Sequence, residues 1–328
     1  MVLVATLALS LGAAEAFLAL VRPIEHMAPV HRDATPQWQL VHQPSAVPGL
    51  AYELRPNASG ERNGGRFRIN GQGRRGPEPI AAGPDTVRIA VVGDSFTFGF
   101  GVDDAESYPA VLEAELNAGA GPDYQVLNYG VGGYSSRDEA LVVRHKVLPA
   151  EPDLVIVGYF FNDPEIDPIQ PLQRSYRPVA SWQRWNLARL LHAGLTNAAR
   201  QRYGGGDYYK YLHRHPRKWA SVERAFADIA RACGAAGVPV ALVIFPAPPL
   251  DGWPHYPYHE LHAQVAATAD AAGLEVLDLY EPFSRFAPES VRISEDDVHP
   301  TPLAHREAAQ RLADLIGERL AGARDRRP

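Results

Sequence analysis

Short apolar segments recur along the chain from residue 86 onward, and a stretch with helical periodicity follows nearly every one of them. Five of these segments have the length and composition of buried strands, and they occupy residues 86–92, 124–129, 153–160, 238–245 and 274–280. Strands with such continuous apolar character are typical of parallel sheets that helices cover on both faces. We therefore expect an α/β fold of three layers (α/β/α), with a doubly wound, five-stranded parallel sheet of the flavodoxin-like type.

The segments between these strands predict helices that cover the sheet. The predicted helices occupy residues 106–117, 136–148, 217–236, 258–272 and 301–320. Ser136 and Glu139 have the spacing of a capping box at the start of the second helix. Cys233, the only cysteine, lies on the apolar stripe of the third helix and is interpreted as a small core residue. A single cysteine excludes an internal disulfide and a cysteine-based zinc cluster.

The N-terminal segment predicts an association with a membrane. Residues 2–21 are apolar except for Ser10 and Glu15, and as a helix they would extend about 30 Å, the thickness of the hydrocarbon core. Ala14 and Ala16 flank Glu15 as in a small-x-small cleavage site, so a cleaved secretory signal competes with an uncleaved anchor. A buried soluble helix is the third alternative. We expect a membrane-anchored or secreted protein whose folded domain lies outside the cytoplasm.

The chain divides into four parts by composition. After the segment at residues 1–21, residues 22–85 form an extension rich in Pro, Gly and Arg, interpreted as turns and short extended pieces wrapped around a domain. A disordered linker is the alternative. The main domain is expected at residues 86–322, and it contains an insertion at about residues 164–216 that is rich in Trp and Tyr. An insertion of this length indicates a lid or pocket wall, or a structural excursion with its own small core.

Charge and composition exclude some classes of partner. The 328 residues carry a formal net charge of −6, which gives no electrostatic reason to expect a nucleic-acid ligand. Several histidines between residues 213 and 262 invite a metal interpretation, but "HELH" does not have the spacing of HExxH, and no metal site is expected. The sequence carries no indication of an oligomeric state.

Polar residues follow the predicted strands at four places. "GDS" ends at Ser95 after the first strand, "NYGVGG" ends at Gly133 after the second, and Asn162 follows the third. "DDVHP", which contains Asp296 and His299, follows the fifth strand and precedes the last helix. Because function in an open parallel sheet collects beyond the carboxyl ends of the strands, we expect these groups to converge on one edge.

The residue types at this edge are those that acyl transfer requires. A serine hydroxyl becomes an effective nucleophile when an imidazole takes its proton, and His299 is the candidate for that role. Asp296, three residues earlier, is within reach of His299 across one turn and would orient it; Asp297 is the alternative. Backbone N–H groups and the Asn162 amide would stabilise the negative oxygen of a tetrahedral intermediate.

These blocks resemble those of the SGNH, or GDSL-like, hydrolase superfamily, over about residues 86–320. The blocks that carry the resemblance are "GDSFTFG", "NYGVGG", "YFFND" and "DDVHPTPLAH". The resemblance implies the SGNH hydrolase fold and a Ser-His-Asp triad without a cofactor. The residues that it implies are Ser95 as nucleophile, Asp296 and His299 as its partners, and Ser95, Gly133 (or Gly130) and Asn162 as the oxyanion hole. The sequence departs from the family at Phe96, where leucine is usual, and at Phe160, where glycine is usual.

The function expected first is a serine esterase or deacylase that cleaves carboxylic esters through an acyl-enzyme. Its substrate would be a small molecule, or a polysaccharide or lipid ester. The nearest alternative is an O-acyltransferase that acts on an envelope polysaccharide with the same triad. A catalytically inactive binding module on the same fold is the alternative from another class, and the joint presence of Ser95, Asn162, Asp296 and His299 speaks against it.

Overall fold

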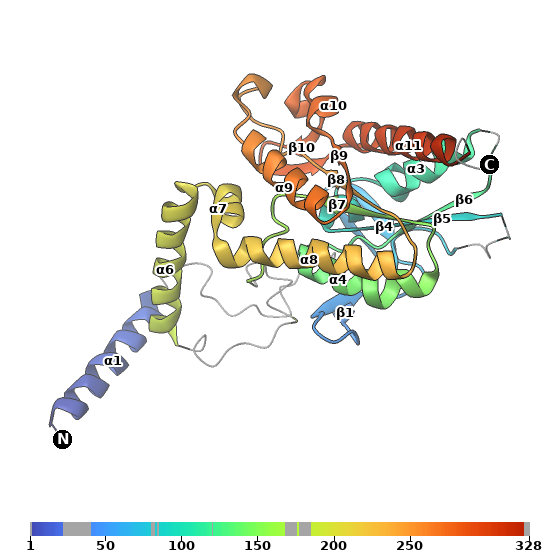
Figure 1. Cartoon of the computed structure of the whole chain (residues 1–328). Helices are drawn as coiled ribbons and strands as arrows, with labels where there is room; N and C mark the ends of the chain where they lie inside the picture. Colours follow the sequence, from blue (N-terminus) through green and yellow to red (C-terminus); the bar gives the residue numbers. More distant parts are fainter. Residues whose placement is uncertain are drawn as a thin grey trace.

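A five-stranded parallel sheet forms the centre of the computed structural model, which describes residues 2–21, 41–79, 83, 85–119, 121–167, 176 and 185–324 (Figure 1). The strands are β5 (Val87–Gly93), β6 (Tyr124–Asn128), β7 (Leu154–Tyr159), β8 (Val240–Ile244) and β9 (Glu275–Asp278). Their spatial order is β6-β5-β7-β8-β9, and every neighbouring pair is parallel. The strand order reverses at β5, as in a doubly wound sheet, so the predicted fold class is confirmed.

Helices cover both faces of this sheet. α3 (Tyr108–Asn117) and α11 (Pro302–Arg324) pack together on one face, and α4 (Ser136–Val142) and α8 (Pro216–Ala235) pack on the other (Figure 1). α9 (His259–Ala271) contacts α8, β8 and β9. Cys233 on α8 is fully buried, as expected for a core residue, and burial raises its pKa to about 11.

The sheet core is apolar because both of its faces are covered. Val91 on β5 lies opposite Asn128 of β6 and Ile156 of β7, and Val91 and Ile156 are fully inaccessible to solvent. The three central strands are buried along almost their whole length. Their carboxyl ends therefore have fixed positions relative to one another, which is the condition for a rigid site at that edge.

The capping box predicted from Ser136 and Glu139 lies one residue earlier. Ser135 is the N-cap of α4, and the carboxylate of Asp138 accepts hydrogen bonds from its backbone N–H (3.2 Å) and from its hydroxyl (2.9 Å). Ser136 is already the first helical residue, so it follows the cap. Glu139 is fully buried instead of folding back to the helix terminus.

The N-terminal extension is wrapped around the domain over residues 41–79. Two antiparallel hairpins form this part, from the strands β1 (His42–Pro44), β2 (Tyr52–Leu54), β3 (Ser59–Arg62) and β4 (Gly65–Arg68). Tyr52 is buried against the domain, and its hydroxyl donates to the carbonyl oxygen of Gly132 (2.8 Å). Residues 22–40, the start of the extension, lie outside the described residues.

The predicted insertion contains two helices, α6 (Asn186–Gly204) and α7 (Tyr208–Arg214). Residues 168–175 and 177–184 of the insertion lie outside the described residues. α1 (Val2–Val21) projects away from the sheet and contacts α6 (Figure 1). Glu15 of α1 accepts hydrogen bonds from the first backbone N–H groups of α6, which accounts for an acid within this apolar segment.

None of the helices in the described part of the chain combines the length and the hydropathy that crossing a membrane requires.

Several short elements connect the larger ones. They are the helices α2 (Ser95–Phe98) and α10 (Tyr280–Ser284), the antiparallel strands β10 (Arg292–Ser294) and β11 (Asp297–Pro300), a π-helical turn at Val143–Val147, and 3₁₀ turns at Asp104–Glu106, Leu148–Ala150, Trp253–His255 and Pro288–Ser290. Two of them, α2 and β11, carry the polar residues expected at the edge of the sheet.

Candidate active site

Ser95 is held at the carboxyl end of β5 by a tight strand-to-helix turn. Glycine is required at position 93, because a Cβ there would lie only 2.8 Å from the carbonyl oxygen of Gly158 on β7. The carboxylate of Asp94 caps α2 by accepting a hydrogen bond from the backbone N–H of Phe96 (2.8 Å). Ser95 is the first residue of α2, and within the described part of the chain its backbone N–H donates to no group.

A hairpin near the C-terminal end of the chain brings His299 to Ser95. The Nε2 atom of His299 on β11 lies 2.7 Å from the Oγ atom of Ser95, which is 204 residues away in the sequence. The Nδ1 atom forms a short hydrogen bond with Oδ1 of Asp297, and the backbone N–H of His299 donates to the same oxygen (3.0 Å). With the proton on Nδ1, Nε2 is left to accept the proton of the serine hydroxyl.

The carboxylate at His299 is that of Asp297, whereas the sequence predicted Asp296. Residues 297–300 form the strand β11, and side chains two positions apart on a strand point to the same side. Asp297 and His299 therefore face the same way. Asp296 lies in the turn of the hairpin and is exposed to solvent. An acid three residues before His299 reaches it across a turn, whereas the residues directly before His299 form a strand.

The electrostatics of Asp297 suit an orienting role. Burial by itself would raise the pKa of this carboxyl, but hydrogen bonds from His299 and the positive charge of Arg62 outweigh it and lower the pKa to about 2. The group is therefore ionised at neutral pH, and it can balance the positive charge that His299 acquires on taking a proton.

The two departures from the family pattern contact each other. The ring of Phe96 stacks on the ring of Phe160 with their centroids 3.8 Å apart, and Phe96 also packs against the imidazole of His299 (5.2 Å). A second phenylalanine, Phe100, meets the same imidazole at 5.5 Å. The ring at position 160 thus fills space beside Phe96, and together these aromatic residues restrict the orientation of His299.

Asn162 lies at the site through a contact with Asp94. Its amide nitrogen donates to Oδ2 of Asp94 (2.9 Å), and the hydroxyl of Ser95 lies 3.3 Å from the same oxygen. One carboxylate oxygen thus joins the end of β5 to the loop after β7. The structure brings Asn162 to Ser95 as expected, with one amide N–H directed to Asp94.

The glycine loop after β6 passes close to α2. A Cβ on Gly130 would lie 2.3 Å from the backbone nitrogen of Phe98, so only glycine fits at that position. Asn128 fixes the loop, because its side chain accepts from the N–H of Gly130 (2.8 Å) and donates to the carbonyl of Thr97 (3.0 Å). Gly133 is buried and has a φ of 79°, a left-handed conformation that favours glycine. Its role as an oxyanion donor stays a prediction.

Sequence reasoning missed a group of buried carboxyls behind Ser95. Asp94, Glu139 and Asp163 are each almost completely buried and influence one another electrostatically. Burial first, and then the charge of the neighbouring acids, raise the pKa of Glu139 and of Asp163 well above the ordinary values. The signals in the sequence were the positions of Asp94 beside Ser95 and of Asp163 beside Asn162. Over the described residues, no group of three or more acids, histidines or cysteines has an arrangement that fits a metal ion.

The sequence of this domain matches the family model of the GDSL-like lipase/acylhydrolase family over residues 91–307. That span covers most of the chain and includes Ser95, Gly133, Asn162 and His299. The chain therefore belongs to the GDSL-like lipase/acylhydrolase family, which is a family of hydrolases.

The solved structures that resemble this one include three enzymes of low sequence identity. They are an α/β hydrolase enzyme, LAE5, from the metagenome of Lake Arreo in Spain (20% identity, TM-score 0.46, 73% of this chain and 97% of that one), a lipase/acylhydrolase from Enterococcus faecalis (17%, 0.45, 71% and 96%), and the acetyl xylan esterase AlAXEase (16%, 0.45, 70% and 100%). A comparison with curated proteins finds no match.

Proposed function

We propose that this protein is a serine esterase that cleaves carboxylic esters through an acyl-enzyme on Ser95. The observation that carries the proposal is the 2.7 Å contact between Ser95 Oγ and His299 Nε2, with Asp297 on the opposite side of the imidazole. Membership of the GDSL-like lipase/acylhydrolase family supports the same reaction class.

In the proposed mechanism, Ser95 Oγ attacks the ester carbonyl carbon while His299 Nε2 takes its proton. The imidazolium then gives this proton to the departing alcohol, which leaves the acyl group bound to Ser95. Water attacks the acyl-enzyme while His299 takes a proton from it; the bond between the acyl carbon and Ser95 Oγ then breaks, His299 returns the proton to Oγ, and the carboxylic acid is released. Asp297 remains ionised throughout and holds Nδ1–H of His299 in place.

The oxyanion in this mechanism is stabilised by the backbone N–H of Ser95, that of Gly133 and the second amide N–H of Asn162. The N–H of Ser95, which donates to no group among the described residues, and the contact between Asn162 and Asp94 support this assignment. Donors that are already oriented before the reaction stabilise the developing charge without reorganisation.

The substrate class is tested with p-nitrophenyl esters of increasing acyl length and with acetylated sugars, each with and without an oligosaccharide acceptor. Hydrolysis of at least one ester that is lost in Ser95→Ala supports the proposal. Preferred transfer of the acyl group to the sugar acceptor would favour the O-acyltransferase alternative. Absence of both activities would contradict both.

We further propose that α1 attaches the protein to a membrane surface, with the catalytic domain outside the cytoplasm. The support is a set of exposed apolar side chains on α1, namely Leu7 (62% exposed), Leu9 (75%), Phe17 (62%) and Leu20 (84%). α6, which contacts α1, adds exposed Leu191 and Leu195. Large apolar side chains exposed together on one helix are typical of a surface that contacts a membrane or a partner.

A further inference from the structure

The β3–β4 hairpin of the N-terminal extension reaches the carboxylate that holds His299. The amide nitrogen of Asn63, in the turn of this hairpin, donates to Oδ2 of Asp297 (2.6 Å). The other oxygen of the same carboxylate, Oδ1, is bonded to His299. Both oxygens of Asp297 are thus occupied, one by the imidazole and one by a residue outside the family match at residues 91–307.

We propose that Asn63 is a positioning residue of the active site, which fixes the carboxylate of Asp297 in the orientation that His299 requires. This inference rests on the proposed function, because it assigns Asn63 to the same serine, histidine and aspartate. The N-terminal extension would then contribute a residue to the catalytic centre.

The conformation of the turn presents the Asn63 side chain. Asn63 and Gly64 are the two central residues of the turn, and both have positive φ, 50° and 86°. A two-residue hairpin turn with positive φ at both positions favours the Asn-Gly pair, because asparagine tolerates the left-handed region better than most residues. The turn thus accommodates Asn63 without unusual strain, and the side chain can donate its hydrogen bond to Asp297.

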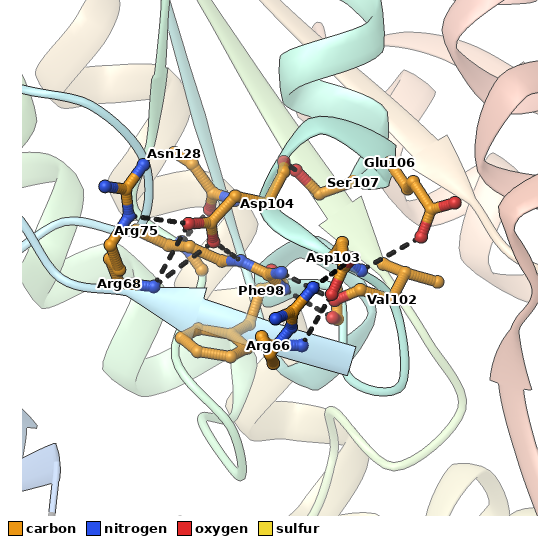
Figure 2. Close-up of polar contacts among 12 residues, drawn as sticks. Arg66, Arg68, Arg75, Phe98, Val102, Asp103, Asp104, Glu106, Ser107 and Asn128 are labelled. Atoms are coloured by element: carbon orange, nitrogen blue, oxygen red, sulfur yellow. Dashed lines mark hydrogen bonds and ion pairs between the residues drawn. The ribbon is translucent and has the colours of Figure 1, made fainter. Parts of the chain in front are cut away.

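Hydrogen bonds hold the β3–β4 hairpin against the loop that follows α2, the helix that begins at Ser95. Figure 2 shows the backbone N–H groups of Arg66 and Arg68 donating to the carboxylates of Asp103 (2.8 Å) and Asp104 (3.2 Å). Gly65 lies so close to this loop that a Cβ would be 2.3 Å from the backbone nitrogen of Val102. β4 therefore has a fixed position beside residues 99–104, and the turn at Asn63 has a fixed position at the site.

Arg75 joins the extension to the same loop from the other side. It is almost completely buried, and its guanidinium donates to Asp104 (2.9 Å), to the carbonyl of Phe98 (2.8 Å) and to that of Val102 (2.7 Å) (Figure 2). A buried arginine with this many partners stabilises one arrangement only, because any shift leaves a charged donor without an acceptor. The extension and the segment after Ser95 therefore move as one unit.

A second residue of the hairpin contributes charge at the same place. The guanidinium of Arg62 lies over the ring of Phe100 (4.4 Å), which in turn packs on His299. Its positive charge helps to lower the pKa of Asp297. Other titratable groups interact electrostatically with Asp297 or His299 from the surrounding elements. They are Asp94 at the end of β5, Tyr209 on α7 and His305 on α11. These neighbours are common to all variants compared below.

The test compares Asn63→Ala, Asn63→Gly and Asn63→Asp with the wild type in the full chain. Glycine retains the positive φ of the turn but has no side chain, so it separates the shape of the turn from the hydrogen bond. Asn57→Ala is the matched control, because Asn57 also has positive φ (59°), precedes the same hairpin and lies beside Gly71. The readouts are kcat, KM, the pH dependence of kcat/KM and the NMR titration of the His299 imidazole.

We expect Asn63→Ala and Asn63→Gly to lower kcat about three- to tenfold with little change in KM, because the misaligned base affects the transition state more than substrate binding. In Asn63→Asp the added negative charge favours imidazolium, so the His299 titration and the acidic limb of kcat/KM both move to higher pH. Asn57→Ala should match the wild type.

Wild-type kcat in Asn63→Gly, together with an unshifted His299 titration in Asn63→Asp, would overturn the inference while leaving the esterase intact. If the wild type hydrolyses no ester, the proposed function has failed. The NMR titration still decides the role of Asn63 in that case: a shift in Asn63→Asp supports its contact with the Asp297–His299 pair, and no shift refutes it.

Discussion

Asp297 holds His299 through one carboxylate oxygen and meets Asn63 through the other, while its neighbour Asp296 faces solvent. Two adjacent acids with such different surroundings offer an internal comparison. Only the residue on the same side of β11 as His299 can orient the imidazole and balance its charge. The difference between these two positions is a direct consequence of strand geometry.

Asp297→Asn should lower kcat by about a hundred- to ten-thousandfold, because an amide at this position favours the wrong tautomer of His299 and gives no charge compensation. Asp296→Asn should retain kcat within about twofold of the wild type. Steady-state kinetics on one good ester substrate measure both. The reverse ranking would show that the acid three residues before His299 is the orienting one.

Asn162→Ala should lower kcat by roughly a hundred- to a thousandfold with little change in KM, because an oxyanion donor acts on charge that develops only in the transition state. Ser95 and His299 remain in place, so a fluorophosphonate should still label the enzyme, more slowly. A fall in kcat of less than about threefold would reduce Asn162 to a structural partner of Asp94.

Sequence reasoning placed Ser95, His299 and Asn162 at one edge because strand ends can be predicted from apolar runs. It preferred Asp296 to Asp297 because an acid three residues before the histidine fits the family pattern better, and a single sequence does not reveal that residues 297–300 form a strand. The contact of Asn63 had no local signal at all, since it joins residues that are 234 positions apart.

At the scale of elements, the apolar runs identified all five strands of the sheet and the helices that cover it. The two hairpins of residues 41–79 were not predicted as strands, because they are short and are stabilised by contacts with distant residues such as Gly132. α6 was also missed, since hardly any of its residues are buried. Regular patterns arise from burial, and segments with little burial leave a weak pattern.

The buried start of α4 predicts a pH dependence of stability. Burial, followed by the charges of Asp94 and Asp138, raises the pKa of Glu139, so the folded protein binds this proton more tightly than the unfolded chain does. The associated stability is fully present below the ordinary pKa of 4.5 and is lost as the pH rises toward the raised value. The contribution of Glu139 to the stability of the wild type should therefore fall as the pH is raised above 4.5.

Glu139→Gln removes this titration and keeps the shape of the side chain. The free energy of unfolding of Glu139→Gln should therefore increase relative to that of the wild type as the pH rises above 4.5. Urea unfolding at pH 4.5 and at higher pH values measures the difference. Glu115→Gln, at an exposed position of α3, serves as the control. An identical pH slope in Glu139→Gln and in the wild type would contradict the assignment.

At the level of the whole molecule, the proposed active site combines parts from both ends of the chain. Residues 41–79 precede the family match, yet they contact the serine helix, the glycine loop and the last hairpin. The division at residue 86 predicted from composition therefore describes a change in sequence character, and it does not separate the extension from the site.

Attachment of the whole protein to a membrane through α1 can be tested by fractionation. Full-length protein should sediment with membranes and require detergent for release, whereas a chain without residues 2–21 should stay in the soluble fraction and retain ester hydrolysis. The exposed apolar side chains of α1 are the physical reason. Recovery of the full-length protein in the cytosolic fraction without detergent would refute the attachment.

The central claim, that Ser95 is a nucleophile activated by His299, is tested most directly by covalent labelling. The protein is treated with a fluorophosphonate, digested, and mapped by mass spectrometry, with Ser95→Ala and His299→Ala treated in parallel. We predict one adduct, on Ser95, that is absent from Ser95→Ala and forms at least about a hundredfold more slowly in His299→Ala. An adduct on another residue, or equal labelling without His299, would contradict the account.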